Sequence, residues 1–343
     1  MRILKMQAKY LEVFLESLDK FGVLYGPIRK RGVLTFDRVE RVSDLVLGGE
    51  HPMIPLKKLF HPKQFTMMHF NEKGFSPDYS IMEKRVVIGA HPCEIHGLLR
   101  LDDVFLSEPA DPYYAGLRKS TAIIGFSCLP TENSLCSSTR TDIVEEGFDL
   151  FFVDLDDFYL VWVGSSLGHD MIYEREEFFD ENVAPEDIQR YLAWREKRNK
   201  MFKHHFEFKS MPDVMELSYN SKIWEEFADK CLSCGQCSMV CPTCNCFNVT
   251  DILDITNEAV GRRERVWDSC MFADYSLVSG GHNFREARAD RLKLWYTHKL
   301  KAFGDEYGTP GCVGCGRCVD TCPVDINVLT ISEALTTREV PTR

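Results

Sequence analysis

The chain has 343 residues, of which 44% are hydrophobic, and this is enough to build the cores of two domains. Its formal net charge is −11 and it has no long basic stretch, so nucleic acid is a poor candidate for a partner. No window approaches the roughly 18 apolar residues that a membrane-spanning helix requires. The first residues have the pattern of an amphipathic helix and not of a signal peptide, so we expect a cytoplasmic protein without a membrane span.

The first half of the chain mixes predicted strands and helices. The pattern of residues 1–20 predicts a helix, and short apolar runs after it predict strands. Two of these runs flank an Asp-rich turn at 154–157 and predict a hairpin. The predicted strands lie at 23–25, 86–89, 122–126, 151–153 and 158–163. Strands mixed with helices predict an α/β domain.

The pattern becomes helical and charged from Pro185 onward. Proline suits the first turn of a helix, and acidic residues follow it, as the helix dipole favours. The predicted buried face of this helix consists of Ile188, Tyr191 and Leu192. A second amphipathic helix then leads directly into Cys231. We therefore expect an α/β domain over residues 1–215 and a second domain over residues 216–343.

The second domain contains one cysteine pattern twice. Residues 231–242 and 312–323 both follow C-x2-C-x2-C-x3-C-P, the signature of ferredoxins that bind two [4Fe-4S] clusters. In such ferredoxins the fourth cysteine of each motif binds the cluster of the other motif. This crossing predicts two ligand sets, namely Cys231, Cys234, Cys237 and Cys322 for one cluster, and Cys312, Cys315, Cys318 and Cys241 for the other.

Two other uses of these cysteines are disfavoured. Paired C-x2-C units also build four-cysteine zinc sites, but a zinc ribbon needs neither the third cysteine nor the Cys-Pro that follows. A disulfide framework is typical of secreted proteins, whereas thiols stay reduced in the cytoplasm. Iron–sulfur clusters and electron transfer are therefore the leading interpretation.

The segment between the motifs suggests the architecture of this domain. Seventy residues separate Cys241 from Cys312, and they carry helical patterns such as residues 287–301. We therefore expect an all-helical two-cluster ferredoxin domain, so that the whole chain is of a mixed α+β class. No G-x-G-x-x-G follows a predicted strand and no P-loop motif occurs, so the sequence predicts no flavin or nicotinamide site on this chain.

Six further cysteines lie outside the two motifs. Cys93 and Cys128 follow predicted strands, and Cys136 is within loop reach of them, so the three are candidates for a third iron–sulfur site or a redox-active thiol group. His91 and His96 flank Cys93, which also makes a His/Cys zinc site conceivable. The other candidates for further ligands are Cys244, Cys246 and Cys270. The alternative for all six is simple packing, because free cysteine is among the most buried residue types.

A short basic run interrupts this acidic chain at Arg262, Arg263 and Arg265. Such a run could offset the negative charge of a cluster or meet an acidic partner. The alternative is a solvated helix end.

Several longer strings resemble a known family. They are CLSCGQCSMVCPTCNCF, WDSCMFADYSLVSGGHNFR and DRLKLWYTHK in the second domain, and HPCEIHGLLRLDDVFLS in the first. These strings are similar to the beta subunit of cytoplasmic sulfhydrogenases and, more distantly, to an iron–sulfur electron-transfer subunit of anaerobic sulfite reductase. The resemblance implies a protein that relays electrons between a flavin subunit handling NAD(P)H and a catalytic subunit of hydrogenase, sulfite reductase or heterodisulfide-reductase type.

The chain departs from this family at one position. The family often has Cys-Phe-Cys where this chain reads Ser134-Leu135-Cys136. With Cys93 and Cys128, relatives would have four cysteines in the first domain, enough for a third cluster. This chain has three.

The sequence thus predicts an iron–sulfur electron-transfer subunit of a multi-subunit oxidoreductase, with two [4Fe-4S] clusters and no stand-alone catalytic site. We expect it to work with a flavin/NAD(P)H-binding subunit, together with a catalytic oxidoreductase subunit, and the first domain would dock one of them. The alternative is a self-sufficient iron–sulfur reductase with a substrate or flavin site in the N-terminal domain.

Overall fold

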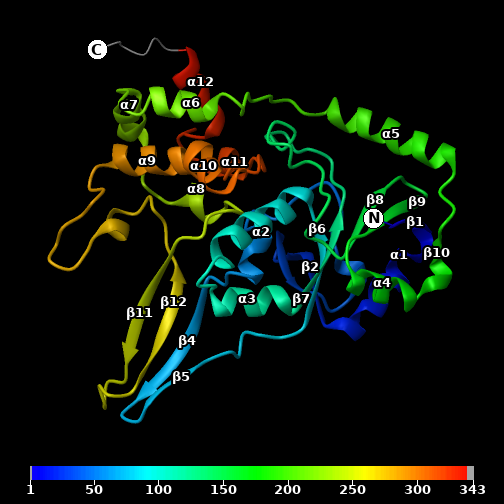
Figure 1. Cartoon of the computed structure of the whole chain (residues 1–343), viewed down its shortest axis with the longest axis horizontal. Helices are drawn as coiled ribbons and strands as arrows, with labels where there is room; N and C mark the ends of the chain where they lie inside the picture. The colour runs from blue at the N-terminus through cyan, green and yellow to red at the C-terminus, as the bar shows by residue number, and fades with distance from the viewer. Residues whose placement is uncertain (1, 338–343) are drawn as a thin grey trace.

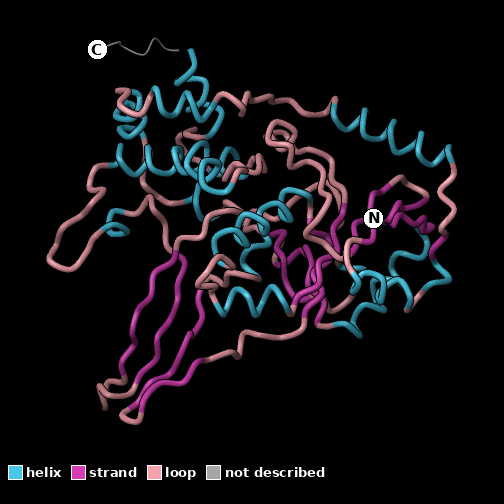
Figure 2. The backbone as a smooth tube through the Cα atoms, in the orientation of Figure 1, coloured by secondary structure: helices cyan, strands magenta, loops and turns pink. Residues whose placement is uncertain are grey.

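The computed structural model describes residues 2–337, and its largest element is a mixed eight-stranded sheet with strand order β10-β1-β9-β8-β7-β6-β2-β3 (Figures 1 and 2). The central strands β2, β6, β7 and β8 run parallel, and the outer strands pair antiparallel with their neighbours. The strands are β1 Arg2–Gln7, β2 Val23–Lys30, β3 Val33–Arg38, β6 Arg85–Ala90, β7 Thr121–Phe126, β8 Leu150–Asp154, β9 Phe158–Val163 and β10 Phe179–Asp180.

Helices cover both faces of this sheet, which explains why β6 and β7 are almost continuously apolar and buried. Val86 packs in one core with residues of α1 and α4, whereas its neighbour Val87 packs in a second core with residues of α2, α3 and α5. The helices of this part are α1 Leu11–Ser17, α2 Pro92–Phe105, α3 Pro112–Lys119, α4 Ser166–Tyr173 and α5 Pro185–Asn199.

The predicted helix over residues 1–20 is wrong in its first part. Residues 2–7 form β1, which pairs antiparallel with β9, and helix α1 begins only at Leu11. Leu4 and Met6 are fully buried and alternate with less buried neighbours, as in a strand with one face on the core. The predicted hairpin at 151–163 is confirmed as β8 and β9, and Asp111 caps α3 by accepting a hydrogen bond from the backbone N–H of Tyr114 (2.8 Å).

The predicted buried face of α5 is wrong for Ile188 and Leu192, whereas Tyr191 is partly buried and packs against the second core. Ile188 and Leu192 are 47% and 49% exposed, and the helix buries Asp187 and Arg198 instead. Asp187 accepts hydrogen bonds from the Lys5 ammonium at 2.7 and 2.9 Å, and Arg198 binds the loop that follows β7. Polar contacts with distant residues thus orient this helix, and helical periodicity does not reveal them.

The second half of the chain is mainly helical around a third hydrophobic core, which includes Trp224, Trp295 and Tyr296. Its helices are α6 Met211–Leu217, α7 Ile223–Lys230, α8 Gln236–Met239, α9 Arg288–Thr297, α10 Phe303–Tyr307, α11 Arg317–Thr321 and α12 Val328–Thr337. Figure 1 shows these helices gathered at one end of the molecule, beside α2.

The segment between the cysteine motifs is not all-helical, which corrects the expectation from the sequence. It contains a β-hairpin formed by β11 Phe247–Leu253 and β12 Gly261–Trp267. This hairpin extends a second one from the first half of the chain, formed by β4 Gln64–Asn71 and β5 Gly74–Pro77, so that the four strands make one antiparallel sheet. Figure 1 shows this sheet projecting from the body of the molecule. The division at residue 215 remains a prediction, and both halves contribute to this sheet.

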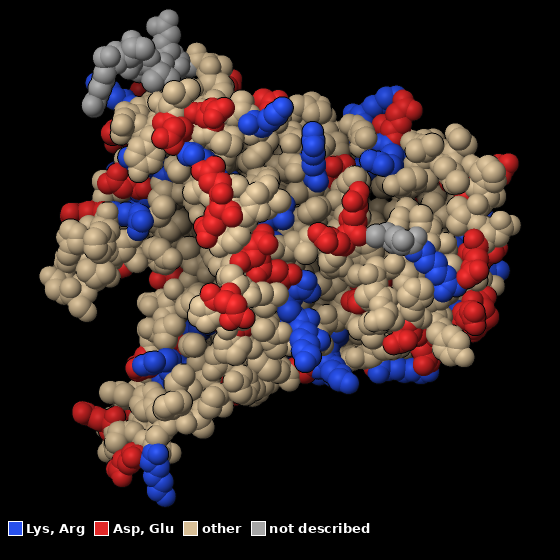
Figure 3. Space-filling model, in the orientation of Figure 1, with Lys and Arg blue, Asp and Glu red and all other residues tan. Residues whose placement is uncertain are grey.

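Acidic and basic side chains are interspersed over the face of the molecule in Figure 3, without a broad basic surface. Among residues 2–337, no helix has the length and apolar character needed to cross a membrane.

Candidate functional site

Each cysteine motif forms a tight loop that leads into a short helix. Gly235 and Gly316 adopt left-handed backbone conformations (φ 72° and 80°) directly before α8 and α11. Gly314 has a φ of 59°, and a Cβ there would lie 2.5 Å from the backbone of Leu135. Glycine is therefore required by both conformation and space in the second loop.

Backbone N–H groups of these loops point at cysteine sulfurs. Ser233 and Gly314 donate to the Sγ atoms of Cys231 and Cys312, both at 3.4 Å, which places equivalent bonds in the two motifs. N–H groups aimed at sulfur stabilise the negative charge of thiolates. The loops are thus built to hold thiolate sulfurs.

The first of two cysteine-lined cavities holds one predicted ligand set. Its lining includes Cys231, Cys234, Cys237 and Cys322. The rest of its wall is largely apolar and includes Met271, Leu292, Trp295, Tyr296 and Ile326. Three of these cysteines come from the first motif and the fourth from the second.

The second cavity holds the other predicted set. Its lining includes Cys312, Cys315, Cys318 and Cys241. Here three cysteines come from the second motif and one from the first. Trp295 lines both cavities, so the two are neighbours.

The cysteines surround spaces and do not converge on a point. Within residues 2–337, no group of three or more His, Cys, Asp or Glu side chains could hold a single metal ion. Burial raises the pKa of the Cys312 thiol to about 12, and it also raises the pKa of Cys237 and Cys318. Buried thiols of this kind become thiolates when a metal centre supplies positive charge. The donor set therefore fits a polynuclear, thiolate-bound group in each cavity.

Three buried cations surround the second cavity, and the sequence did not reveal them. Lys299 lines the cavity and donates to the Thr243 hydroxyl (2.7 Å). Lys57, on the first half of the chain, donates to the carbonyl of Cys244 (2.9 Å). Arg317 is fully buried and pairs with Glu94. These charges can offset the negative charge of a thiolate-bound cluster.

The pKa values of the two lysines are shifted in opposite directions by their surroundings. Burial by itself disfavours the charged form of Lys299, but nearby thiols, Cys241 first among them, outweigh burial and raise its pKa. For Lys57, burial prevails and lowers the pKa. The two lysines therefore respond differently to the same group of thiols.

The three extra cysteines of the first half lie near one another and near the second cavity. Cys93 and Cys136 are buried, and Cys136 is close enough to Cys128 and Cys315 for their charges to raise its pKa, although burial is the larger cause. The hydroxyl of Ser134 is hydrogen-bonded to the backbone N–H of Thr131 (2.9 Å) and to its hydroxyl (2.8 Å). The Nε2 atom of His96 is 2.7 Å from the carbonyl oxygen of Ile143, and burial lowers the pKa of His91 to about 4.

The remaining cysteines lie beside the first motif. Cys246 is hydrogen-bonded to Cys270, and this bond lowers the pKa of Cys246 to about 6. Cys244 is buried and hydrogen-bonded to Cys241 of the second cavity. They therefore lie next to the predicted ligand sets.

The arginine run belongs to a strand and not to a helix end. Arg263 pairs with Asp251 across the β11–β12 hairpin (2.7 Å). Arg265 is buried, pairs with Asp111 and lies 4.1 Å from the centre of the Phe247 ring. These arginines hold the four-stranded sheet together and against α3.

This arrangement is that of an iron–sulfur protein. A family model described as a 4Fe-4S dicluster domain matches residues 230–326, which include both motifs. The chain is 39% identical over 326 residues to the beta subunit of sulfhydrogenase 2 from Pyrococcus furiosus, and the match covers 95% of this chain and 96% of that relative. The chain therefore belongs to the family of sulfhydrogenase beta subunits. No solved structure gives a significant match.

Proposed function

We propose that this chain is the electron-transfer subunit of a cytoplasmic multi-subunit oxidoreductase. It relays electrons between a flavin subunit that handles NAD(P)H and a catalytic subunit of hydrogenase, sulfite reductase or heterodisulfide-reductase type, and has no stand-alone catalytic site. The observation that carries the proposal is the pair of cavities, each lined by four cysteines and both lined by Trp295. The family membership supports it.

Each cavity holds one [4Fe-4S] cluster in this proposal. The ligands of cluster 1 are Cys231, Cys234, Cys237 and Cys322, and those of cluster 2 are Cys312, Cys315, Cys318 and Cys241. The two cavities have similar linings, and each motif has one N–H···S bond at the same position. Both observations support the same kind of cluster in each cavity. The shared wall at Trp295 supports direct electron transfer between them.

In this proposal, cluster 1 lies at the end of the electron relay that faces a partner subunit. Cys234 is exposed and Leu232, in the same loop, is 62% exposed. The neighbouring loop ends in Phe284, which is 67% exposed. Arg291 joins the two loops, because its guanidinium donates to the Arg285 carbonyl (3.0 Å) and to the Ser233 hydroxyl (3.3 Å). Exposed apolar side chains beside a cluster are typical of a docking surface.

Cluster 2 faces the first half of the chain. The hydroxyl of Thr141 donates to the Val313 carbonyl (2.7 Å), and the backbone N–H of Leu135 donates to the Gly314 carbonyl (2.7 Å). The loop after β7 thus covers the second motif. The other partner docks on the first domain in this proposal.

The experiment is anaerobic purification of the tagged chain with its native partners, followed by assays of the whole complex. The Cys315→Ser complex should assemble but lose transfer from NAD(P)H to the terminal acceptor. Reduction of a dye by NAD(P)H and dye-driven catalysis, each of which bypasses the relay, should persist. If the isolated chain alone carries out the full reaction, the relay proposal is wrong and the chain is a self-sufficient reductase.

A further inference from the structure

The walls of the two cysteine cavities differ in charge. Among the described residues that line them, Lys299 is the only lysine, arginine, aspartate or glutamate, and it lines the second cavity alone. It lies in a π-helical turn, His298–Ala302, which continues α9. Such turns are frequent at functional sites. Trp295, four residues earlier, also lines this cavity, and residues at this spacing share one side of a helix.

Two polar groups of this wall lack the partners that burial demands. Lys299 is 1% exposed, and its ammonium donates to the Thr243 hydroxyl (2.7 Å) but forms no ion pair with a carboxylate among residues 2–337. The indole N–H of Trp295 is buried and has no hydrogen-bond partner in the described part of the chain. Buried charges are stable when a counter-ion compensates them, and buried donors are stable when an acceptor meets them. The wall therefore suits an anionic occupant that is rich in acceptors, as a thiolate-bound cluster is.

Thr243 fixes the ammonium beside the ligands of the second cavity. Its hydroxyl donates to the carbonyl of Gly311 (2.6 Å), next to Cys312, and its oxygen lies 3.2 Å from the Sγ atom of Cys241. Cys312 and Cys241 belong to the same predicted ligand set, and both line this cavity. A single hydroxyl group therefore joins Lys299 to the chain at two of the four cysteines.

In the described part of the chain, the wall of the first cavity contains no cation. Two arginines lie near its loop, but neither lines the cavity. Arg288 is exposed and donates to the carbonyl of Cys231 (2.8 Å), where water screens its charge. Arg291 joins two loops through the carbonyl of Arg285 and the hydroxyl of Ser233. The second cavity therefore has a buried positive charge in its wall that the first cavity lacks.

We propose that Lys299 holds the reduction potential of cluster 2 above that of cluster 1, so that an electron on this chain rests on cluster 2. This inference rests on the two-cluster relay proposed above. Reduction adds one negative charge to a cluster, and a fixed positive charge stabilises it most in a buried wall of low dielectric constant. Solvent access differs less between the two sets, because only Cys234 of the eight cysteines is exposed.

The favoured step is the transfer of one electron from reduced cluster 1 to oxidised cluster 2. No bond forms or breaks in this step, and no proton moves. The electron then lies beside the first half of the chain, where the second partner docks in the relay proposed above.

The test is an anaerobic redox titration of the full, cluster-loaded chain, followed by low-temperature EPR. The unmodified chain should show two one-electron steps. Cys231→Ser, which removes cluster 1, should retain the step at the higher potential. Lys299→Met removes the charge and keeps the length of the side chain. It should lower the higher potential so that the preference of the electron for cluster 2 falls about tenfold, which corresponds to about 59 mV, and it should leave the lower step unchanged.

Three further variants separate charge from shape. Lys299→Gln also removes the charge but keeps a donor for Thr243, so it should give the same shift as Lys299→Met. Lys299→Arg keeps the charge and should retain the higher potential. Lys301→Met removes a lysine of the same turn whose charge Asp305 compensates (2.6 Å), and it should move neither step.

Two results would overturn the proposal. One is a higher potential that both neutral variants of Lys299 leave unchanged. The other is retention of the lower step in Cys231→Ser, because cluster 2 would then be the weaker electron acceptor. Either result in a chain with about eight irons contradicts the role of Lys299 and leaves the relay intact. A chain that binds only about four irons contradicts the two-cluster relay itself.

Discussion

Arg317, which precedes Cys318 in the second cysteine motif, forms an ion pair with Glu94 at the start of α2, and both side chains are almost completely buried (0% and 1% exposed). The Glu94 carboxylate also accepts a hydrogen bond from the backbone N–H of Leu56 (2.8 Å). One carboxylate therefore joins the loop of the second cysteine motif to two segments of the first half of the chain. The two halves of the chain are coupled through this pair.

Removal of the Glu94 charge should destabilise the protein strongly. Glu94→Gln keeps the shape of the side chain but leaves the Arg317 charge buried without its counter-ion, which costs about 3–5 kcal/mol. Chemical unfolding of the cluster-loaded chain measures this change. Glu181→Gln, which removes the exposed partner of Arg2, should cost less than about 1 kcal/mol. Equal effects of the two variants would show that the buried pair has no special role.

The crossed ligand sets can be tested with pairs of cysteine variants. Cys231→Ser should remove one cluster, or about four irons. Adding Cys322→Ser should cause no further loss, because both residues belong to the same cavity. Adding Cys241→Ser instead should remove the second cluster as well. The reverse pattern in iron content and low-temperature EPR spectra would mean that each motif binds its own cluster.

Gly314 should be essential for assembly of cluster 2. Its left-handed conformation and the 2.5 Å approach of Leu135 leave no room for a side chain. Gly314→Ala should therefore displace the loop and lower iron content toward that of one cluster. Gly308→Ala is a matched control, since Gly308 has a similar φ of 73° but open space around it. The control should lose only about 1 kcal/mol of stability and keep both clusters.

His61 should make the protein sensitive to mild acid. Its ring is buried between Phe105 and Trp267, with ring centres 5.3 and 5.8 Å away, and burial together with the nearby Lys57 lowers its pKa to about 3. Because the unfolded chain takes up this proton near pH 6.5, stability falls as pH drops from about 6.5 toward 3, by about 1.4 kcal/mol per pH unit.

The measurement compares His61→Phe with the unmodified chain in urea at about pH 7.5 and 5.5. Lowering the pH should cost the variant about 1.4 kcal/mol less than it costs the unmodified chain. The exposed His205→Phe should show no such difference between the two pH values. A pH dependence that His61→Phe leaves unchanged would contradict this role.

Local patterns predicted the parts of this molecule that depend on neighbours in sequence. The spacing of the motifs placed Cys322 with the first motif and Cys241 with the second, and the structure brings the residues of each predicted set around one cavity. The hairpin at 151–163 was also predicted, because turn residues act over only a few positions.

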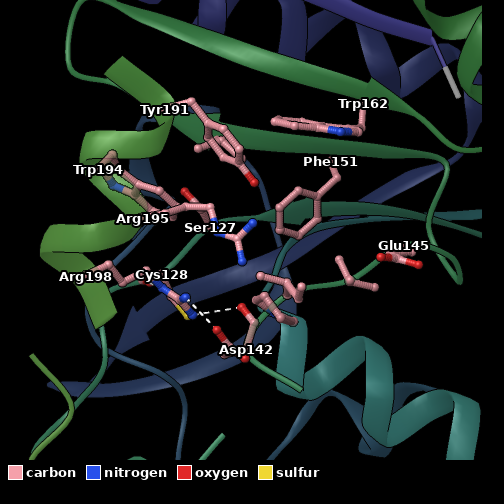
Figure 4. Close-up of a pocket in the computed structure, with 14 residues that line it drawn as sticks. Ser127, Cys128, Asp142, Glu145, Phe151, Trp162, Tyr191, Trp194, Arg195 and Arg198 are labelled. Atoms are coloured by element: carbon pink, nitrogen blue, oxygen red, sulfur yellow. Dashed lines mark hydrogen bonds and ion pairs between the residues drawn. The ribbon is translucent and has the colours of Figure 1, made fainter. Parts of the chain in front are cut away.

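The features that the sequence concealed depend on contacts between distant segments. Strand β12 pairs with β4, which lies almost two hundred residues earlier in the chain. Neither the β4–β5 hairpin nor the β11–β12 hairpin has a long apolar run that would predict a sheet. Lys57 and Lys299 look like ordinary surface lysines in the sequence, yet both are buried beside the cysteines. A pocket lined by Trp162 of β9 and by Tyr191 and Trp194 of α5 (Figure 4) draws on two separate segments, so neither segment alone predicts it.

The most direct test of the two-cluster proposal is the iron, acid-labile sulfide and zinc content of the anaerobically purified chain. Two clusters require about eight irons and eight sulfides per chain, without zinc. About twelve would mean that Cys93, Cys128 and Cys136 hold a third cluster, which would extend the relay. About four irons, or zinc in place of iron, would contradict the proposal that two clusters carry electrons through this protein.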